Sequence, residues 1–337
     1  MASGDSPDRV DHLRLVDPPL DLTVSFVDPA VGLAVLAAYA GFVDIRPGRA
    51  PGAHTLHCVV DPCRHDALLA TAAANGGVTV RTAGSGPSPA TGVTLGRTLV
   101  LAGLDRGSQS IVEREIRMLL SRQLLDDGWV PVHAAGLVGP TGRAILLMGP
   151  KRAGKTTTLL GLLRDGAGLM ANDKLFVRCR YGEAPMVRSL PVAAGLRGTT
   201  LALFPELAPL SARRVALHVD NVGTTRAGDP GKLFAPVQAI ADAFGVPVVP
   251  TAPLGTIFAV RFTADLARSR SRPLEPRELA DLLATERLDG DVRWCTEWLG
   301  VGHDVVVNGI DPVGVPAFRV DVAPGGVDMV RTEWMYA

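Results

Sequence analysis

The chain of 337 residues is long enough for two domains, and 47% of its residues are hydrophobic, which excludes global disorder. Its 34 basic and 34 acidic residues cancel, so the sequence lacks the positive charge expected of a nucleic-acid-binding protein. The uncharged stretch 29–43 is too short and too rich in Gly and Ala to span a membrane. We therefore expect a folded α/β protein that binds neither nucleic acid nor membrane.

Four cysteines are spread along the chain, and no two of them form a C-x-x-C pair. So few cysteines in a chain of this length are typical of a reduced cytoplasmic protein. The first ten residues are polar and acidic and do not resemble a signal peptide. A cytoplasmic location is the resulting expectation.

The N-terminal region, 1–107, is expected to form a mixed α/β domain that selects the substrate. Its apolar residues alternate with polar ones or form short continuous runs, which predicts strands and packed helices. A stretch rich in Gly, Ser and Pro predicts a loop. The strands are expected at 21–27, 54–60 and 93–101, the helices at 31–42 and 66–74, and the loop at 82–91.

An amphipathic helix is expected at 108–126, because its apolar residues fall on one broad helical face and its charged residues on the other. Gly128 follows directly and is the residue type that ends such a helix. We assign 108–128 to a helix that connects the two domains.

The second domain is expected to occupy 129–337. It begins with two apolar runs joined by a short Gly-Pro-Thr-Gly segment, which predicts a β-hairpin, and a helix follows the second run. The strands are expected at 130–138, 143–148 and 175–179, and the helices at 155–164, 236–244 and 275–285.

A glycine-rich segment, 149–156, lies between the predicted hairpin and helix and is expected to bind phosphate. Glycine lets the backbone approach phosphate oxygens closely, and the free N–H groups of the following helix attract an anion. Lys155 would reach the β and γ phosphates, and the hydroxyl of Thr156 would bind Mg²⁺. The motif G-x-x-x-x-G-K-[ST] is matched at every fixed position by Gly149, Pro150, Lys151, Arg152, Ala153, Gly154, Lys155 and Thr156.

The common ATPase classes carry an apolar strand ending in Asp downstream of this loop. Here the run 256–262 has no terminal Asp, and the run 317–320 before Asp321 is a weak match. These classes are therefore disfavoured.

Three features stand in order within the segment 133–177: His133 one hairpin before the phosphate loop, the loop itself, and the sequence Gly-Ala-Gly-Leu-Met-Ala-Asn-Asp at 166–173. In these features the segment resembles the catalytic domain of HPr kinase/phosphorylase and its kinase-like relatives. In the family the third feature reads G-x-x-L-x-A-D-D. A fainter similarity surrounds Arg197. The resemblance implies an HPr-kinase-like α/β domain that uses ATP and Mg²⁺ and forms a homo-oligomer.

Residue roles follow from this resemblance. Asp173 would be the general base or a metal partner beside Thr156, and His133 would lie near the phosphates. Arg197 would contact a phosphate or the phosphate acceptor. Thr157 would belong to the nucleotide site, since the distantly related phosphoenolpyruvate carboxykinases carry Gly-Lys-Thr-Thr at this place.

The chain also departs from the family. Asn172 replaces the family's first Asp, Thr157 stands where the HPr enzymes have Glu, and Gly195 stands where they tend to have Glu. These differences argue against HPr as the substrate and against phosphorolysis. They are compatible with a kinase that modifies a peptide serine or a small-molecule hydroxyl.

Each of these residues also has a simpler interpretation. His133 suits a hydrogen-bonded core position, and Asp173 suits an ordinary turn. For Lys174 the alternatives are a phosphate contact and a surface position, and for Lys232 they are an active-site cation and a solvent-exposed loop position. The His and Cys residues at positions 54, 57, 58, 63 and 65 do not have the spacing of a known zinc finger, so we discount a zinc site there.

We expect an ATP- and Mg²⁺-dependent kinase that transfers the γ-phosphate to a hydroxyl, preferably a Ser or Thr of a peptide or protein other than HPr. Phosphoryl transfer requires charge neutralisation, alignment and a proton acceptor, which Lys155, Mg²⁺ and Asp173 would supply. The alternatives are a small-molecule kinase, a nucleotide-binding regulatory protein without catalysis, and an NTPase that drives a partner.

Overall fold

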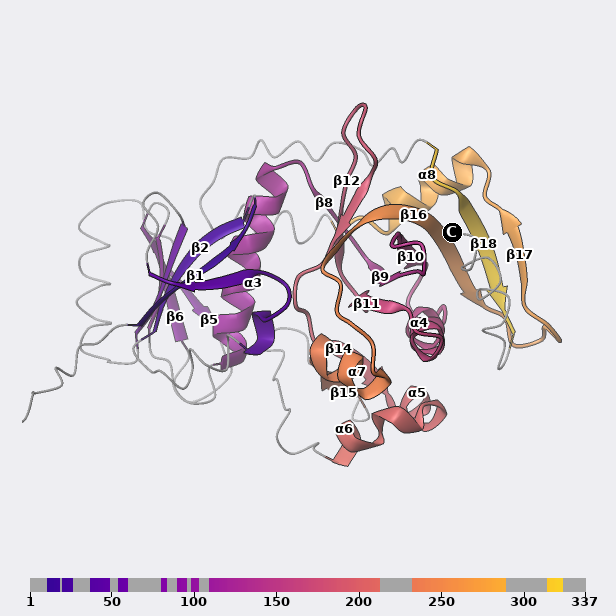
Figure 1. Cartoon of the computed structure of the whole chain (residues 1–337), viewed down its shortest axis with the longest axis horizontal. Coiled ribbons are helices and arrows are strands. Elements are labelled where there is room, and N and C mark those ends of the chain that lie inside the picture. Colours follow the sequence, from indigo (N-terminus) through magenta and orange to yellow (C-terminus); the bar gives the residue numbers. More distant parts are fainter. Residues whose placement is uncertain are drawn as a thin grey trace, which may run out of the picture. The chain divides into compact units, whose positions relative to one another are not determined.

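The computed structural model describes ten stretches of the chain: 11–18, 20–26, 37–48, 54–59, 80–83, 90–95, 98–102, 109–212, 232–288 and 314–323. These residues fold as an α/β protein (Figure 1), as the sequence predicts. The described residues up to Asp127 belong to one compact unit, and those from Gly128 onward belong to a second. None of the described helices is long and apolar enough to cross a membrane.

The first unit contains a seven-stranded sheet with the order β3-β1-β2-β4-β7-β6-β5. Strands β2, β4 and β7 run parallel to one another, and the other pairs are antiparallel. The strands span Asp11–Asp17 (β1), Leu20–Phe26 (β2), Asp44–Pro47 (β3), His54–Val59 (β4), Val80–Ala83 (β5), Ala90–Leu95 (β6) and Thr98–Ala102 (β7).

Helix α3 (Gln109–Asp126) packs against β2 and β4 within the first unit. Val112, Ile116 and Leu120 are fully buried, as the apolar helical face predicts. The side chain of Gln123 accepts a hydrogen bond from the backbone N–H of Asp21 at 2.7 Å and donates one to its carbonyl at 2.8 Å. The helix predicted as a connector therefore also covers this sheet.

Three predicted elements of this unit differ from the structure or lie outside the described residues. The single strand predicted at 93–101 is wrong, because this region forms the antiparallel pair β6 and β7, with Leu95 opposite Thr98. The predicted helix 66–74 and most of the predicted helix 31–42 lie outside the described residues, as do Cys63 and His65 of the discounted zinc cluster.

The second unit contains a nine-stranded sheet with the main order β11-β9-β10-β16-β13-β12-β8; in addition, β18 pairs with β16, and β17 pairs with β18. The strands span Val130–Val132 (β8), Ala134–Val138 (β9), Ala144–Met148 (β10), Gly168–Ala171 (β11), Leu175–Arg178 (β12), Met186–Arg188 (β13), Thr251–Phe262 (β16), Arg270–Pro273 (β17) and Ala317–Val322 (β18).

A separate two-stranded sheet pairs β14 with β15. These strands and the helices of the unit span Ala194–Arg197 (β14), Lys232–Ala235 (β15), Lys155–Arg164 (α4), Gly198–Leu203 (α5), Ala208–Ala212 (α6), Val237–Phe244 (α7) and Pro276–Thr285 (α8), with a 3₁₀ turn at Pro205–Leu207.

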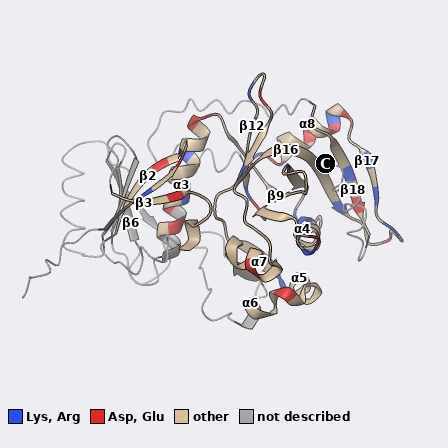
Figure 2. Cartoon of the chain, in the orientation of Figure 1, with Lys and Arg blue, Asp and Glu red and all other residues tan. Residues whose placement is uncertain are grey.

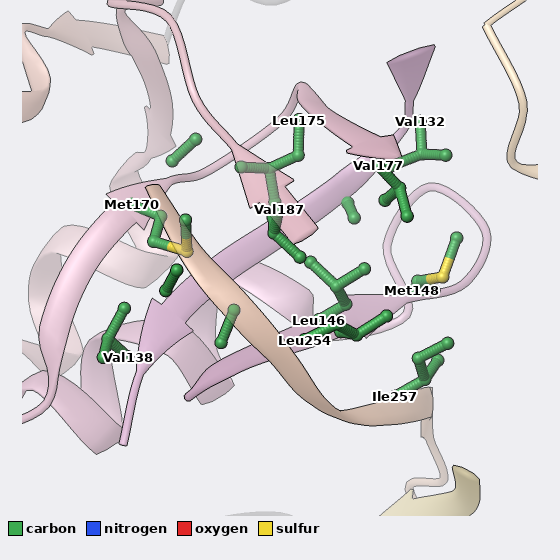
Figure 3. Close-up of a cluster of buried hydrophobic side chains, with 14 of the residues drawn as sticks. Val132, Val138, Leu146, Met148, Met170, Leu175, Val177, Val187, Leu254 and Ile257 are labelled. Atoms are coloured by element: carbon green, nitrogen blue, oxygen red, sulfur yellow. The ribbon is translucent and has the colours of Figure 1, made fainter. Parts of the chain in front are cut away.

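Strand β10 lies at the centre of the second unit, and all five of its residues are buried. Leu146 and Met148 join a hydrophobic cluster that also contains Leu254 of β16 (Figure 3). Leu283 of α8 belongs to the same cluster. Because side chains alternate along a strand, Ile145 and Leu147 point to the opposite face. Helix α4 packs against β9 and β10. The strand that leads into the phosphate loop is thus held on both faces.

The predicted hairpin forms, since β9 and β10 are antiparallel with Val138 opposite Ala144. The continuous strand predicted at 130–138 is wrong, because it divides into β8 and β9 with His133 between them. The backbone N–H of His133 donates to the carbonyl of Glu286 at 2.7 Å, so this position leaves the regular ladder. His133 is therefore held at a junction between strands and is 28% exposed.

Candidate phosphate-binding and catalytic site

The sheet topology brings several of the predicted site residues to one edge. Strands β10, β16 and β18 are parallel, so their carboxyl ends lie at the same edge. Strand β9 is antiparallel to both β10 and β11, so its beginning and the end of β11 lie at that edge too. His133 directly precedes β9, and the phosphate loop directly follows β10. Asp173 comes shortly after the end of β11.

The phosphate loop has backbone geometry that requires glycine. Gly149 has φ 137° and Gly154 has φ 96°. A Cβ placed on Gly149 would lie 2.6 Å from the carbonyl oxygen of Val260, which is too close for any other residue. Arg152, with φ 73°, is the non-glycine residue with a left-handed backbone in the described part of the chain. The loop therefore keeps a close turn against the end of β16.

Helix α4 begins at Lys155, as predicted, and Gly154 at its N-cap supplies no side-chain hydrogen bond. The first turn also contains no acidic residue. The N–H groups of this turn and the helix dipole are thus available to an anion. Thr156 and Thr157 lie in this turn and are partly exposed, whereas Lys151 and Arg152 on the loop are exposed.

Lys155 is 8% exposed. Its Nζ donates hydrogen bonds to the carbonyl oxygens of Gly149 at 2.5 Å and Pro150 at 3.3 Å. Burial lowers the pKa of Lys155, and the charges of Glu286 and Asp173 oppose this shift. The Lys155 side chain thus lies over the loop, where the charges of Glu286 and Asp173 act on it.

His133 joins two carboxylates. Its Nε2 lies 3.3 Å from Oδ1 of Asp173, and its Nδ1 lies 2.6 Å from Oε2 of Glu286. The hydrogen bond with Asp173 raises the pKa of His133 most strongly, burial and Lys155 lower it, and Glu286 raises it. Asp173 is 64% exposed at its side chain and Glu286 only 5%. The cluster thus presents one accessible and one buried carboxylate.

Glu286 was missed by the sequence analysis. It caps the C-terminal end of α8 and lies 153 residues from His133 in the chain. An antiparallel bridge between Val132 and Arg287 holds the two segments together. No local motif marks Glu286, because its partner comes from a different part of the sequence. Only the long-range pairing of these two segments identifies it.

The other predicted residues have different surroundings. Asp173 lies in the turn after β11, and not at the start of a strand. Asn172 beside it is 8% exposed, and its side-chain oxygen has no hydrogen-bond partner among the described residues. Arg197 ends β14, opposite Lys232 in the separate two-stranded sheet, and its role at the site stays a prediction.

The donor chemistry of this edge fits Mg²⁺, which prefers oxygen ligands and usually shares them with substrate phosphates. The hydroxyl of Thr156, the carboxylate of Asp173 and the unpaired side-chain oxygen of Asn172 are such donors. Within the described ranges, no three His, Cys, Asp or Glu side chains form a metal-binding group by themselves. If Mg²⁺ binds at this edge, these three oxygen donors would hold it.

No protein-family model and no curated protein matches the chain. Among solved structures, it is similar to the HPr(Ser) kinase/phosphatase from Coxiella burnetii, with 10% sequence identity and a TM-score of 0.29. The similarity covers 61% of this chain and 93% of that chain. Because this likeness is distant, we derive the function of the site from its own geometry and chemistry.

Proposed function

We propose that this chain is a phosphotransferase that moves the γ-phosphoryl group of ATP to a hydroxyl group of an acceptor. The observation that supports it best is the contact of His133 with Asp173, combined with the electrostatic coupling of both to the buried Lys155. A phosphate-binding lysine and an accessible carboxylate at one sheet edge are what phosphoryl transfer to a hydroxyl requires.

In the proposed reaction, the acceptor oxygen attacks the γ-phosphorus and its proton passes to the carboxylate of Asp173. The bond between the γ-phosphorus and the bridging oxygen breaks, and ADP leaves. Lys155 and the N–H groups at the start of α4 stabilise the negative charge on the phosphate oxygens. Mg²⁺, when bound, neutralises further charge on those oxygens. The 64% exposure of Asp173 leaves room for an acceptor to approach.

The acceptor that we favour is a Ser or Thr hydroxyl of a peptide or protein other than HPr. Asn172 and Gly195 support the exclusion of HPr, because they replace acidic residues of the HPr enzymes with neutral ones. A small-molecule hydroxyl is the other acceptor class. The first unit would select between a peptide or protein acceptor and a small-molecule acceptor. The acceptor that it binds is part of the proposal.

The proposal is tested by incubating the purified chain with γ-labelled ATP and Mg²⁺, alone, with a Ser/Thr peptide library, and with a pool of hydroxyl metabolites. Free phosphate and labelled acceptor are both measured. We expect label on an acceptor in the wild type and in Asp242→Asn, which removes an exposed carboxylate from α7. Asp173→Asn should bind ATP but transfer label about 100- to 10,000-fold more slowly.

Two results would overturn the kinase proposal. Free phosphate formed at the same rate with and without every acceptor would indicate an NTPase. Tight nucleotide binding with neither product would indicate a regulatory protein that has lost catalysis, an alternative that Asn172 favours because it removes one carboxylate.

A further inference from the structure

Glu286 makes two hydrogen bonds to the same residue. Its backbone carbonyl accepts from the N–H of His133 at 2.7 Å, and its carboxylate oxygen lies 2.6 Å from His133 Nδ1. One contact fixes the backbone of His133, and the other fixes the imidazole ring. A histidine held at both points has little freedom to turn its ring.

The second contact also determines which edge of the ring faces the site. A carboxylate accepts hydrogen bonds, so Nδ1 carries a proton toward Glu286. The other nitrogen, Nε2, is then directed at Oδ1 of Asp173, 3.3 Å away, and it donates to that carboxylate when it carries a proton as well. The charged groups that act on His133 are Asp173 from the β11–β12 turn, Glu286 from the end of α8 and Lys155 from α4.

We infer that Glu286 is a positioning residue, which holds the ring of His133 so that Nε2 orients the carboxylate of Asp173 for proton transfer. This inference rests on the proposed phosphotransferase function. Glu286 itself is buried and is not expected to touch ATP or the acceptor. Because Glu286 contacts His133 directly, its effect on kcat should pass through His133, while its charge also opposes the lowering of the Lys155 pKa.

The test uses Glu286→Gln, His133→Ala and the double variant, with the exposed Glu183→Gln as the matched control. Outer-shell partners of a functional histidine typically contribute about 10- to 100-fold to activity. We expect Glu286→Gln to lower kcat by about that factor while the KM for ATP changes less than about twofold. In the His133→Ala background, Glu286→Gln should have no further effect. Glu286→Asp should recover part of the loss.

A second measurement does not depend on activity. Proton NMR of the nucleotide-free protein should show a strongly downfield ring N–H resonance from His133, which disappears in Glu286→Gln. Losses that add in the double variant, or an unchanged kcat with the resonance retained, would overturn the inference. If the wild type transfers no phosphate, the resonance still tests the contact, so failure of the proposed function is seen separately.

A different observation concerns the opposite side of the phosphate loop. In the sheet, β9 and β11 lie on one side of β10, with His133 and Asp173 at their ends, and β16 and β18 lie on the other. If the γ-phosphate binds beside His133 and Asp173, the nucleoside extends to the other side of the loop, toward β16. Phe262, the last residue of β16, is 48% exposed, although most large apolar residues of this unit are buried.

Strand β16 meets the phosphate loop at both of its glycines. The carbonyl of Val260 lies against Gly149, and a Cβ on Gly154 would be 3.7 Å from the Cβ of Phe262. We also propose that Phe262 stacks against the base of the bound nucleotide. Aromatic rings are effective platforms for bases because every base offers a π-face.

This second proposal is tested by calorimetry with ATP and with inorganic tripolyphosphate, which has the phosphates without the nucleoside. Phe262→Ala should weaken ATP binding by about 10-fold or more and leave tripolyphosphate binding unchanged. Phe262→Trp should retain ATP affinity, and Tyr181→Ala, which removes another exposed aromatic residue, should affect neither ligand. Equal losses for both ligands, or no loss for ATP, would overturn it.

Discussion

Charged side chains form different kinds of contact in the two units. In the first unit, Arg14 pairs with Asp21 at 2.6 Å across the β1–β2 pair, only seven residues away in sequence. In the second unit, His133 contacts Glu286 across 153 residues and also contacts Asp173. Local surface pairs contribute little energy and support a hairpin. A cluster assembled from distant segments, next to a buried lysine, is typical of a functional site.

The largest effect should come from removing the accessible carboxylate of the second unit. Asp173→Asn should lower the phosphoryl-transfer rate by about 100- to 10,000-fold, because the variant has no general base for the acceptor hydroxyl. Its affinity for ATP should stay within about threefold of the wild type. Single-turnover transfer and calorimetry measure the two quantities. Equal transfer rates would remove Asp173 from the mechanism.

A somewhat smaller effect is expected from the buried cation of the loop. Lys155→Ala should weaken ATP binding by roughly 100-fold, the equivalent of about 3 kcal/mol in lost charge-assisted hydrogen bonds. Lys151→Ala, which changes an exposed cation on the same loop, should cost less. Calorimetric titration with ATP and Mg²⁺ measures both. Unchanged binding in Lys155→Ala would refute the interpretation of this segment as a phosphate site.

The first unit should respond in stability and not in chemistry. Gln123→Leu leaves the backbone N–H and carbonyl of Asp21 without their side-chain partner and should cost about 1–3 kcal/mol in the unfolding free energy. Gln238→Leu, an exposed control on α7, should cost less than about 0.5 kcal/mol. Urea unfolding measures the cost. A loss of transfer rate in the folded Gln123→Leu protein would show that the first unit also contributes to the chemistry.

The smallest effect concerns a surface pair of the second unit, where charged residues line β17, β18 and α8 (Figure 2). A hydrogen bond from Arg272 lowers the pKa of Glu278 from its ordinary 4.5 to about 2. Since the folded-state pKa is lower, the pair stabilises the protein above pH 4.5 and loses this contribution as the pH falls toward 2.

Glu278→Gln removes this contribution. The difference in urea midpoint between wild type and Glu278→Gln should be small at pH 6 and should shrink at about pH 3. A gap that widens in acid would show that Arg272 does not favour the charged form of Glu278.

Sequence patterns predicted elements well where one segment contains the whole signal. Helix α4 spans Lys155–Arg164, as expected, because a glycine turn precedes it and an amphipathic pattern follows. Predictions were less accurate where pairing partners decide the structure. The runs at 93–101 and 130–138 each look continuous in sequence, yet each divides into two strands with different neighbours.

By itself the sequence determined the glycine loop and the start of α4, since the glycines, the lysine and the helix start are contiguous and their backbone geometry is local. It also identified His133 and Asp173 as candidates through their order around that loop. Only the tertiary structure decided that these two side chains meet, and that Glu286 holds the other edge of His133. The reason is physical: a hydrogen bond across 153 residues exists only after the sheet and α8 have brought both segments together.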